Sequence, residues 1–79
     1  MAVLRLFASA REAAGTSSAE IPGATVNDVL VAAVSRFGDG FAGVLATSKV
    51  WVNGEEVPRD QPVSDKDEVA VLPPVSGGT

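Results

Sequence analysis

The amino-acid sequence predicts an α+β domain in which a mixed five-stranded sheet is covered by one main helix. Several short segments alternate apolar and polar residues, which is the pattern of strands with one buried face. One longer segment, residues 26–37, instead repeats its apolar residues at helical spacing. The last apolar run ends in two prolines and a short Gly-rich end. The chain therefore divides into a folded part, residues 1–72, and a flexible tail, residues 73–79.

The composition of the chain narrows the class of protein. With 79 residues, of which 46% are hydrophobic and 20% charged, the chain is expected to form one globular domain with a small core. No apolar run approaches the ~20 residues of a membrane span. Arg5 interrupts the N-terminal apolar run too early for a signal peptide. We therefore expect a soluble, cytoplasmic protein that has no membrane partner.

The absence of two residue types excludes several kinds of chemistry. The sequence has no cysteine and no histidine, which removes disulfides, thiol chemistry, the commonest metal ligands and the usual general base. Intrinsic catalysis, a bound metal and a bound cofactor are therefore not expected. Asp65, Asp67 and Glu68 match no ion-binding loop and are interpreted as a solvated loop. A net charge of −4 argues against nucleic acid as a partner and favours a protein with a basic face.

The N-terminal part is expected to contain a strand at residues 2–8, a single helical turn at 10–14 and a second strand at 17–21, antiparallel to the first. In the first strand Leu4 and Leu6 face the core, and Phe7 lies on the opposite face with Arg5. Phe7 is there either a partly exposed sheet residue or a contact for another protein. Gly15 is placed to end the helical turn.

The main helix is expected at residues 26–37. Its apolar stripe consists of Val26, Val29, Leu30, Ala33, Val34 and Phe37. Thr25 suits the N-cap, and Asp28 three residues later approximates a capping box. Gly38 is placed to end the helix, whose stripe is expected to cover the sheet.

The remaining strands are expected at residues 49–53, 55–57 and 69–72. In the first of them Val50 and Val52 face inward and Trp51 lies on the other face. Asn53–Gly54 is a strong signal for a tight turn. Residues 41–46 are apolar, but their periodicity does not decide between helix, loop and strand.

The order strand, strand, helix, strand, short strand, strand is that of the β-grasp fold. The first strand pairs locally, and the last must lie inside the sheet to anchor the tail. We therefore expect the first and last strands to be parallel neighbours in the centre of the sheet, where strands are apolar runs.

The tail combines stiffness at its base with narrowness at its end. Pro73 and Pro74 cannot continue the hydrogen-bond ladder of a strand. Gly77 and Gly78 lack Cβ atoms, so their backbone can pass through a slot that excludes other residues. Residues 73–78 span roughly 20 Å when extended, which is enough to enter the active site of another protein. An ordinary disordered chain end is the alternative, because Gly, Ser and Thr are common there.

The chain resembles the small subunit of molybdopterin synthase over nearly its whole length. The segments that carry the resemblance are FASAREAAG (residues 7–15), VNG (52–54), DEVA (67–70) and LPPVSGG (72–78). The last of these is the most specific. This subunit belongs to the ubiquitin-like sulfur carriers, alongside those of thiamine and cysteine biosynthesis. The length of the chain and residues 7–15 fit the molybdopterin branch best.

The resemblance implies a carrier that is not catalytic by itself. An E1-like adenylyltransferase activates the C-terminal glycine carboxylate with ATP, and a sulfur donor system converts it to a thiocarboxylate. The charged tail then enters the large synthase subunit, which holds the catalytic residues. That subunit transfers sulfur to cyclic pyranopterin monophosphate.

The resemblance also implies roles for single residues. Gly78 carries the adenylate and then the sulfur, and Gly77 allows passage through the partner's channel. The groove of the partner is expected to be filled by Leu72, Pro73, Pro74, Val75 and Ser76. Phe7 and Arg11 are further candidates for the docking face, with core packing and a surface charge as equal alternatives.

Thr79 departs from the family pattern, because these carriers usually end at the second glycine. Either a peptidase removes it, or it is tolerated, or the carrier activity has been lost. Three functions therefore stay open. They are a sulfur carrier for the molybdenum cofactor, a carrier of another pathway or a ubiquitin-like protein modifier, and an adaptor whose tail only docks. A thiocarboxylate, an isopeptide bond to lysine or an unmodified tail distinguishes them.

Overall fold

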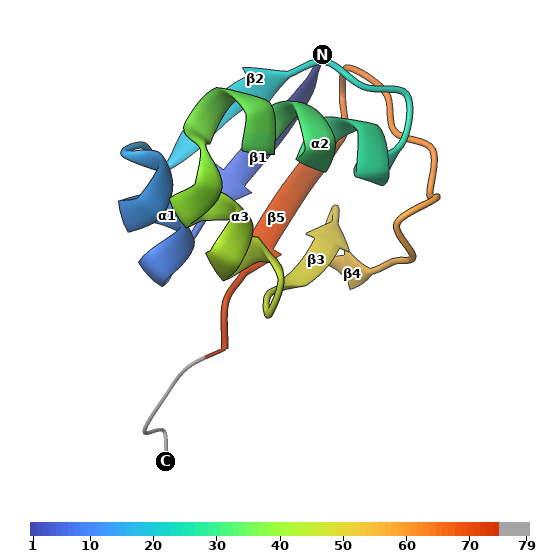
Figure 1. Ribbon diagram of the computed structural model, residues 1–79. Coiled ribbons are helices and arrows are strands. Elements are labelled where there is room, and N and C mark those ends of the chain that lie inside the picture. Colours follow the sequence, from blue (N-terminus) through green and yellow to red (C-terminus); the bar gives the residue numbers. More distant parts are fainter. Residues whose placement is uncertain (75–79) are drawn as a thin grey trace.

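Strand β5 (Glu68–Leu72) is the middle strand of a mixed sheet in the computed structural model, which describes residues 1–74 (Figure 1). The other elements are β1 (Ala2–Leu6), α1 (Ala8–Ala14), β2 (Ser18–Ile21), α2 (Val26–Phe37), α3 (Asp39–Leu45), β3 (Lys49–Val52) and β4 (Glu55–Glu56). The strand order is β2-β1-β5-β3-β4. β1 and β5 are parallel, and the other neighbouring pairs are antiparallel. The predicted β-grasp arrangement is therefore confirmed, including the parallel pair at its centre.

The helices cover one face of the sheet, and the core lies between the two layers (Figure 1). The inward residues of the three central strands are buried, namely Leu4, Leu6, Val50, Val52, Val69 and Val71. Because successive side chains of a strand point to opposite faces, their neighbours lie on the face that the helices leave open. The described part of the chain buries no polar or charged residue in this core.

The first strand is shorter than predicted. It ends at Leu6, and Phe7 is the extended N-cap residue of α1. Ala8 has a φ of 52°, a left-handed conformation that turns the chain out of the sheet. The strand was therefore predicted two residues too long, and Phe7 lies just beyond its end in extended conformation. The predicted single turn is a helix of seven residues, which Gly15 ends at a φ of 78°.

Helix α2 begins and ends where the sequence predicts. The Thr25 hydroxyl accepts a hydrogen bond from the backbone N–H of Asp28 at 3.2 Å, which confirms the N-cap. The Gly38 N–H donates to the Val34 carbonyl at 2.8 Å. The buried part of the stripe consists of Val26, Val29, Leu30 and Ala33, while Val34 and Phe37 are partly buried.

The undecided segment forms most of α3. Phe41 is fully buried there, and its ring meets the Phe37 ring edge-on with a centroid distance of 5.4 Å. Leu45 is also buried, so α3 shares the core with α1 and α2. The cover of the sheet is thus three helices in the described chain rather than one. Within residues 1–74, no helix is both long and apolar enough to cross a membrane.

The turn between β3 and β4 confirms its sequence signal. Asn53 and Gly54 have φ values of 51° and 87°. Two consecutive left-handed residues make the tight turn whose twist matches the flanking strands. The strand that follows is two residues long and therefore ends one residue earlier than expected.

Candidate functional site

The tail leaves the sheet at its centre. β5 lies between β1 and β3, and the strand registers place Val71 beside Leu6 and Leu72 beside Lys49. Pro73 follows at once and has no N–H with which to continue the ladder. Leu72 and Pro73 are half-buried and Pro74 is exposed. The base of the tail is therefore anchored in the interior of the sheet rather than at an edge (Figure 1).

A cavity of about 330 Å³ lies beside the base of the tail. Its lining residues are Thr47, Lys49, Trp51, Leu72, Pro73 and Pro74. Lys49 is opposite Leu72 and Trp51 is opposite Ala70 across the antiparallel β3–β5 pair. Opposed residues share a face of the sheet, so this cavity is on the open face, away from the helices. We call it the tail-base cavity.

Trp51 gives the tail-base cavity a polar feature. Its indole Nε1 is enclosed, and it has no hydrogen-bond partner within residues 1–74. An enclosed donor without an acceptor costs about 1–3 kcal/mol. With the Lys49 ammonium on the same wall, the cavity suits a mainly apolar surface that carries one acceptor.

The central strands carry an ion pair on the same open face. Arg5 Nη1 lies 3.1 Å from Glu68 Oε2, and both side chains are about half exposed. An exposed pair of this kind contributes roughly 0–1 kcal/mol. It therefore adds polar surface to the open face and little stability.

Phe7 lies at the sheet end from which the tail departs. It follows Leu6, which pairs with Val71, and the parallel strands β1 and β5 both end there. The Phe7 side chain is 42% exposed. Arg11 is exposed one helical turn later, and its N–H donates to the Phe7 carbonyl at 3.4 Å. The structure thus places Phe7 at the end of the sheet from which the tail departs. Neither Phe7 nor Arg11 lines the tail-base cavity.

The loop before β5 is more ordered than a solvated acidic segment. Asp67 Oδ1 accepts from the Asn53 amide at 2.9 Å, and Oδ2 accepts from the Ser64 N–H at 2.8 Å. The Asn53 amide oxygen accepts from the Glu68 N–H at 3.0 Å. The hydrogen bond from Asn53, followed by that from Ser64, lowers the pKa of Asp67 below its usual range. These bonds fasten the β3–β4 turn to the start of β5, a structural role for Asp67 that the sequence analysis did not predict.

The predicted site residues are only partly described. Val75, Ser76, Gly77, Gly78 and Thr79 lie outside the described residues, so their roles stay predictions. Within residues 1–74, no three His, Cys, Asp or Glu side chains are grouped to hold a metal. Thr47, Lys49 and Trp51 line the cavity but were not predicted as site residues. Alternation in the sequence places Trp51 off the core, but only the pairing of β3 with β5 places it beside the tail.

A protein-family profile described as the ThiS family matches residues 4–78. The chain belongs to the ThiS family. The match includes β5, the two prolines and the double glycine, so it extends beyond the sheet. The family comprises ubiquitin-like sulfur carriers and modifiers.

Three solved structures show how widely this ThiS-family fold is used. SAMP1 from Haloferax volcanii is 31% identical, with a TM-score of 0.85 over 96% of this chain and 97% of that chain. A Pyrococcus furiosus protein assigned as molybdopterin converting factor, subunit 1, is 30% identical, with a TM-score of 0.79 over 94% and 97%. A chain of the Amycolatopsis orientalis BexX/CysO complex is 27% identical, with a TM-score of 0.81 over 99% and 100%. These neighbours differ in their assigned roles, although they share the fold.

Proposed function

We propose that this ThiS-family chain is the sulfur carrier of molybdenum cofactor biosynthesis, acting as the small subunit of molybdopterin synthase. The observation that carries the proposal is the family match through residue 78, which includes the LPPVSGG end. The FASAREAAG segment at residues 7–15 favours the molybdopterin branch. The similarity to the P. furiosus protein assigned as molybdopterin converting factor, subunit 1, supports the same branch.

The proposed reaction sequence takes place on the carboxylate of Gly78. An E1-like adenylyltransferase transfers AMP from ATP to this carboxylate and releases pyrophosphate. Sulfide supplied by the sulfur donor then attacks the carbonyl carbon of the acyl adenylate and AMP leaves, so that a thiocarboxylate remains. The carrier needs no acid or base of its own for these steps. It contributes an anchored strand, a stiff Pro73–Pro74 base and a Gly77 backbone that is narrow enough for the partner's channel.

The tail-base cavity and the end of β5 form the proposed docking face for the large subunit. Leu72 and Pro73 are half-buried in the free chain, so a partner that covers them removes apolar surface from water at little ordering cost. Trp51 adds a large aromatic surface and an N–H that lacks an acceptor in the described chain. Phe7 extends the face at the same end of the sheet. The E1-like enzyme is proposed to use an overlapping face, because it must reach the same Gly78.

The experiment that tests the proposal compares chains 1–78 and 1–79. Each is incubated with the E1-like enzyme, ATP and the sulfur donor, and its intact mass is recorded. Thr79 moves the terminal carboxylate roughly 3.5 Å along the chain, and adenylation depends on near-contact geometry. We expect chain 1–78 to exchange one oxygen for sulfur and chain 1–79 to stay unmodified until a peptidase removes Thr79. No sulfur on either chain contradicts the carrier function, and sulfur on an intact 1–79 chain contradicts trimming.

The pathway is tested with the thiocarboxylate form of chain 1–78. We expect it to support formation of the molybdopterin dithiolene from cyclic pyranopterin monophosphate when the large subunit is added. The matched reactions contain the sulfur-accepting enzymes of cysteine or thiamine biosynthesis instead. Transfer only in one of those reactions would assign the chain to that pathway.

A second candidate function is protein modification. The observation that favours it is the similarity to SAMP1, a small archaeal modifier protein, at 31% identity and a TM-score of 0.85. In this case Gly78 forms an isopeptide bond with a lysine of a target protein. Mass spectrometry of tryptic peptides from the native cell distinguishes the two functions, because a modifier leaves a tail remnant on lysine and a carrier does not.

A further inference from the structure

Strand β2 forms one edge of the sheet, and within residues 1–74 it pairs only with β1 (Figure 1). The opposite edge, β4, is only two residues long, whereas β2 has four. An edge strand presents backbone N–H and C=O groups to which another strand can add. β2 is therefore the longer of the two edges at which this sheet can be extended.

The register of β1 and β2 decides which backbone groups of β2 face outward. The Leu6 N–H donates to the Ser17 carbonyl at 2.9 Å, so these two residues form a hydrogen-bonded pair. In an antiparallel ladder such pairs alternate with non-bonded ones, and Ser18 and Glu20 occupy the non-bonded positions opposite β1. Val3, which lies opposite Glu20, donates its N–H on the side of β5 instead. Ser18 and Glu20 therefore direct their N–H and C=O groups away from the sheet.

Side chains of the same chain occupy these outward groups. The Thr16 hydroxyl donates to the Ser18 carbonyl at 2.9 Å and accepts from the Ser18 N–H at 3.4 Å. Arg36 Nη1 donates to the Glu20 carbonyl at 3.3 Å. An added strand would need both of these carbonyls as acceptors for its own N–H groups. Thr16 and Arg36 thus compete with an added strand for the same sites.

Arg36 also blocks the edge by its position. It lies in the last turn of α2, and its guanidinium carbon is 5.7 Å from the centroid of the Phe37 ring. A cation over an aromatic ring at an exposed site contributes about 0.5–1 kcal/mol, which favours this placement. A neighbouring strand runs about 4.8 Å from the one it pairs with. A side chain that donates to an outward carbonyl therefore fills the space that such a strand would take.

We propose that β2 is a docking edge for the β2 strand of a second copy of this chain, and that Thr16 and Arg36 keep this edge closed. The outward groups of β2 are arranged symmetrically about Ala19. Two antiparallel copies related by a two-fold axis at Ala19 place Ser18 of each copy opposite Glu20 of the other. Their N–H and C=O groups then form two hydrogen-bonded pairs, and the two glutamates do not face each other. The closed edge does not depend on what the tail carries.

The experiment opens the edge with the double variant Thr16→Val, Arg36→Met. Valine keeps the shape of threonine without the hydroxyl, and methionine keeps a long side chain without donors. We expect the self-association constant, measured by sedimentation and NMR between about 0.05 and about 1 mM, to rise at least about tenfold over that of the parent. Amide resonances of residues 17–21 should shift with protein concentration, whereas those of β4 should not.

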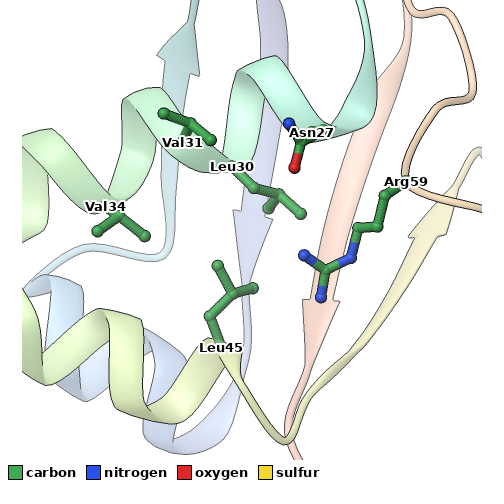
Figure 2. Close-up of a pocket in the computed structure, with 6 residues that line it drawn as sticks. All are labelled: Asn27, Leu30, Val31, Val34, Leu45 and Arg59. Carbon is green, nitrogen blue, oxygen red and sulfur yellow. The ribbon is translucent and has the colours of Figure 1, made fainter.

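The matched control is the double variant Thr16→Ser, Arg59→Met. Serine keeps the hydroxyl that bonds to Ser18, and the loss of Arg59 removes the same charge as the loss of Arg36. Arg59 lines a cavity of about 190 Å³ with residues of α2 and with Leu45, rather than with β2 (Figure 2). The control should therefore associate no more than the parent does.

A further substitution identifies the surface that associates. Glu20→Pro removes an N–H that points away from β1, so it leaves the β1–β2 ladder intact and blocks strand addition. Added to the Thr16→Val, Arg36→Met variant, it should return self-association to the level of the parent. Association that persists with Glu20→Pro uses another surface and overturns the inference.

The inference is also overturned if the opened variant keeps dispersed native resonances and associates no more than the control. Arg36→Met alone leaves the turn at Thr16 unchanged, and it decides the question if the double variant does not fold. It frees the Glu20 carbonyl, so we expect the same concentration-dependent shifts at residues 17–21, with a smaller rise in the association constant. Unchanged self-association of a folded Arg36→Met chain would show that this side chain does not guard the edge.

Discussion

Asn53 joins two turns through one side chain. Its amide nitrogen donates to Asp67 and its amide oxygen accepts from the Glu68 N–H. The hydrogen bond from the Asn53 amide nitrogen is the largest of the causes that lower the pKa of Asp67. Since the folded state favours the charged carboxylate, Asp67 contributes stability above its ordinary pKa of 3.8. The contribution is lost as the pH falls through the lower pKa of the folded state.

The first prediction is that Asn53→Gly raises the pKa of Asp67 toward its ordinary value. Glycine is the right replacement because residue 53 has a φ of 51°, which glycine accepts without strain. NMR titration of the Asp67 carboxyl in the parent and variant measures the change directly. Urea unfolding should show a cost of the substitution that is larger at pH 7 than at pH 3. An unchanged Asp67 pKa in the variant would contradict the assigned cause.

Helix α3 forms although its sequence is a poor helix former. Gly40 and Gly43 lie in its seven residues, and glycine costs roughly 0.5–1 kcal/mol relative to alanine in a helix. The burial of Phe41 and Leu45 offsets this cost. A Cβ at Gly43 would meet no atom within 4 Å, whereas a Cβ at Gly23 would lie 2.6 Å from the Val29 backbone nitrogen.

The second prediction is that substitution by alanine changes the free energy of unfolding in opposite directions at Gly43 and Gly23. Gly43→Ala should raise the free energy of unfolding by about 0.5–1 kcal/mol, because alanine restricts the unfolded chain and fits the open space. Gly23→Ala should lower it by about 1–3 kcal/mol, because the methyl group meets the start of α2. Urea unfolding measures both changes, and equal signs would contradict the packing around Gly23.

The core and the tail are separate parts of one molecule. The buried hydrophobic residues of the described chain all lie between Ala2 and Val71. The tail base adds half-buried Leu72 and Pro73, which remain when the chain is cut after Pro74. Changes in the core should therefore alter the free energy of unfolding, whereas changes in the tail should alter partner binding.

The third prediction is that deletion of residues 75–79 leaves the fold intact and abolishes binding to the large subunit. The free energy of unfolding should change by less than about 0.5 kcal/mol, because no residue of the described core is removed. Calorimetric titration with the large subunit measures binding. Lys66→Gln serves as the control that keeps the tail and should bind as the parent does. Undiminished affinity of the deleted chain would show that the sheet alone recognises the partner.

Local patterns in the sequence account for most of the fold. Alternation and helical spacing act over a few residues, so they located α2 to the residue and all five strands within two residues at each end. The Asn53–Gly54 turn follows from the same kind of local rule, because it needs two left-handed residues. The LPPVSGG end identified the carrier family, and the match through residue 78 bears this out. None of these conclusions depends on which segments meet in space.

The remaining features depend on contacts between distant segments. Residues 41–45 are helical because the core on the sheet side buries Phe41, and their own propensity leaves the choice open. Trp51 belongs to the candidate site because β3 pairs with β5, although the two strands are far apart in the chain. The same holds for Asp67, whose partner Asn53 precedes it by 14 residues. Periodicity in the sequence shows which face of a segment is buried. Which residues that face contacts depends on strand register and packing, and these are known only from the folded chain.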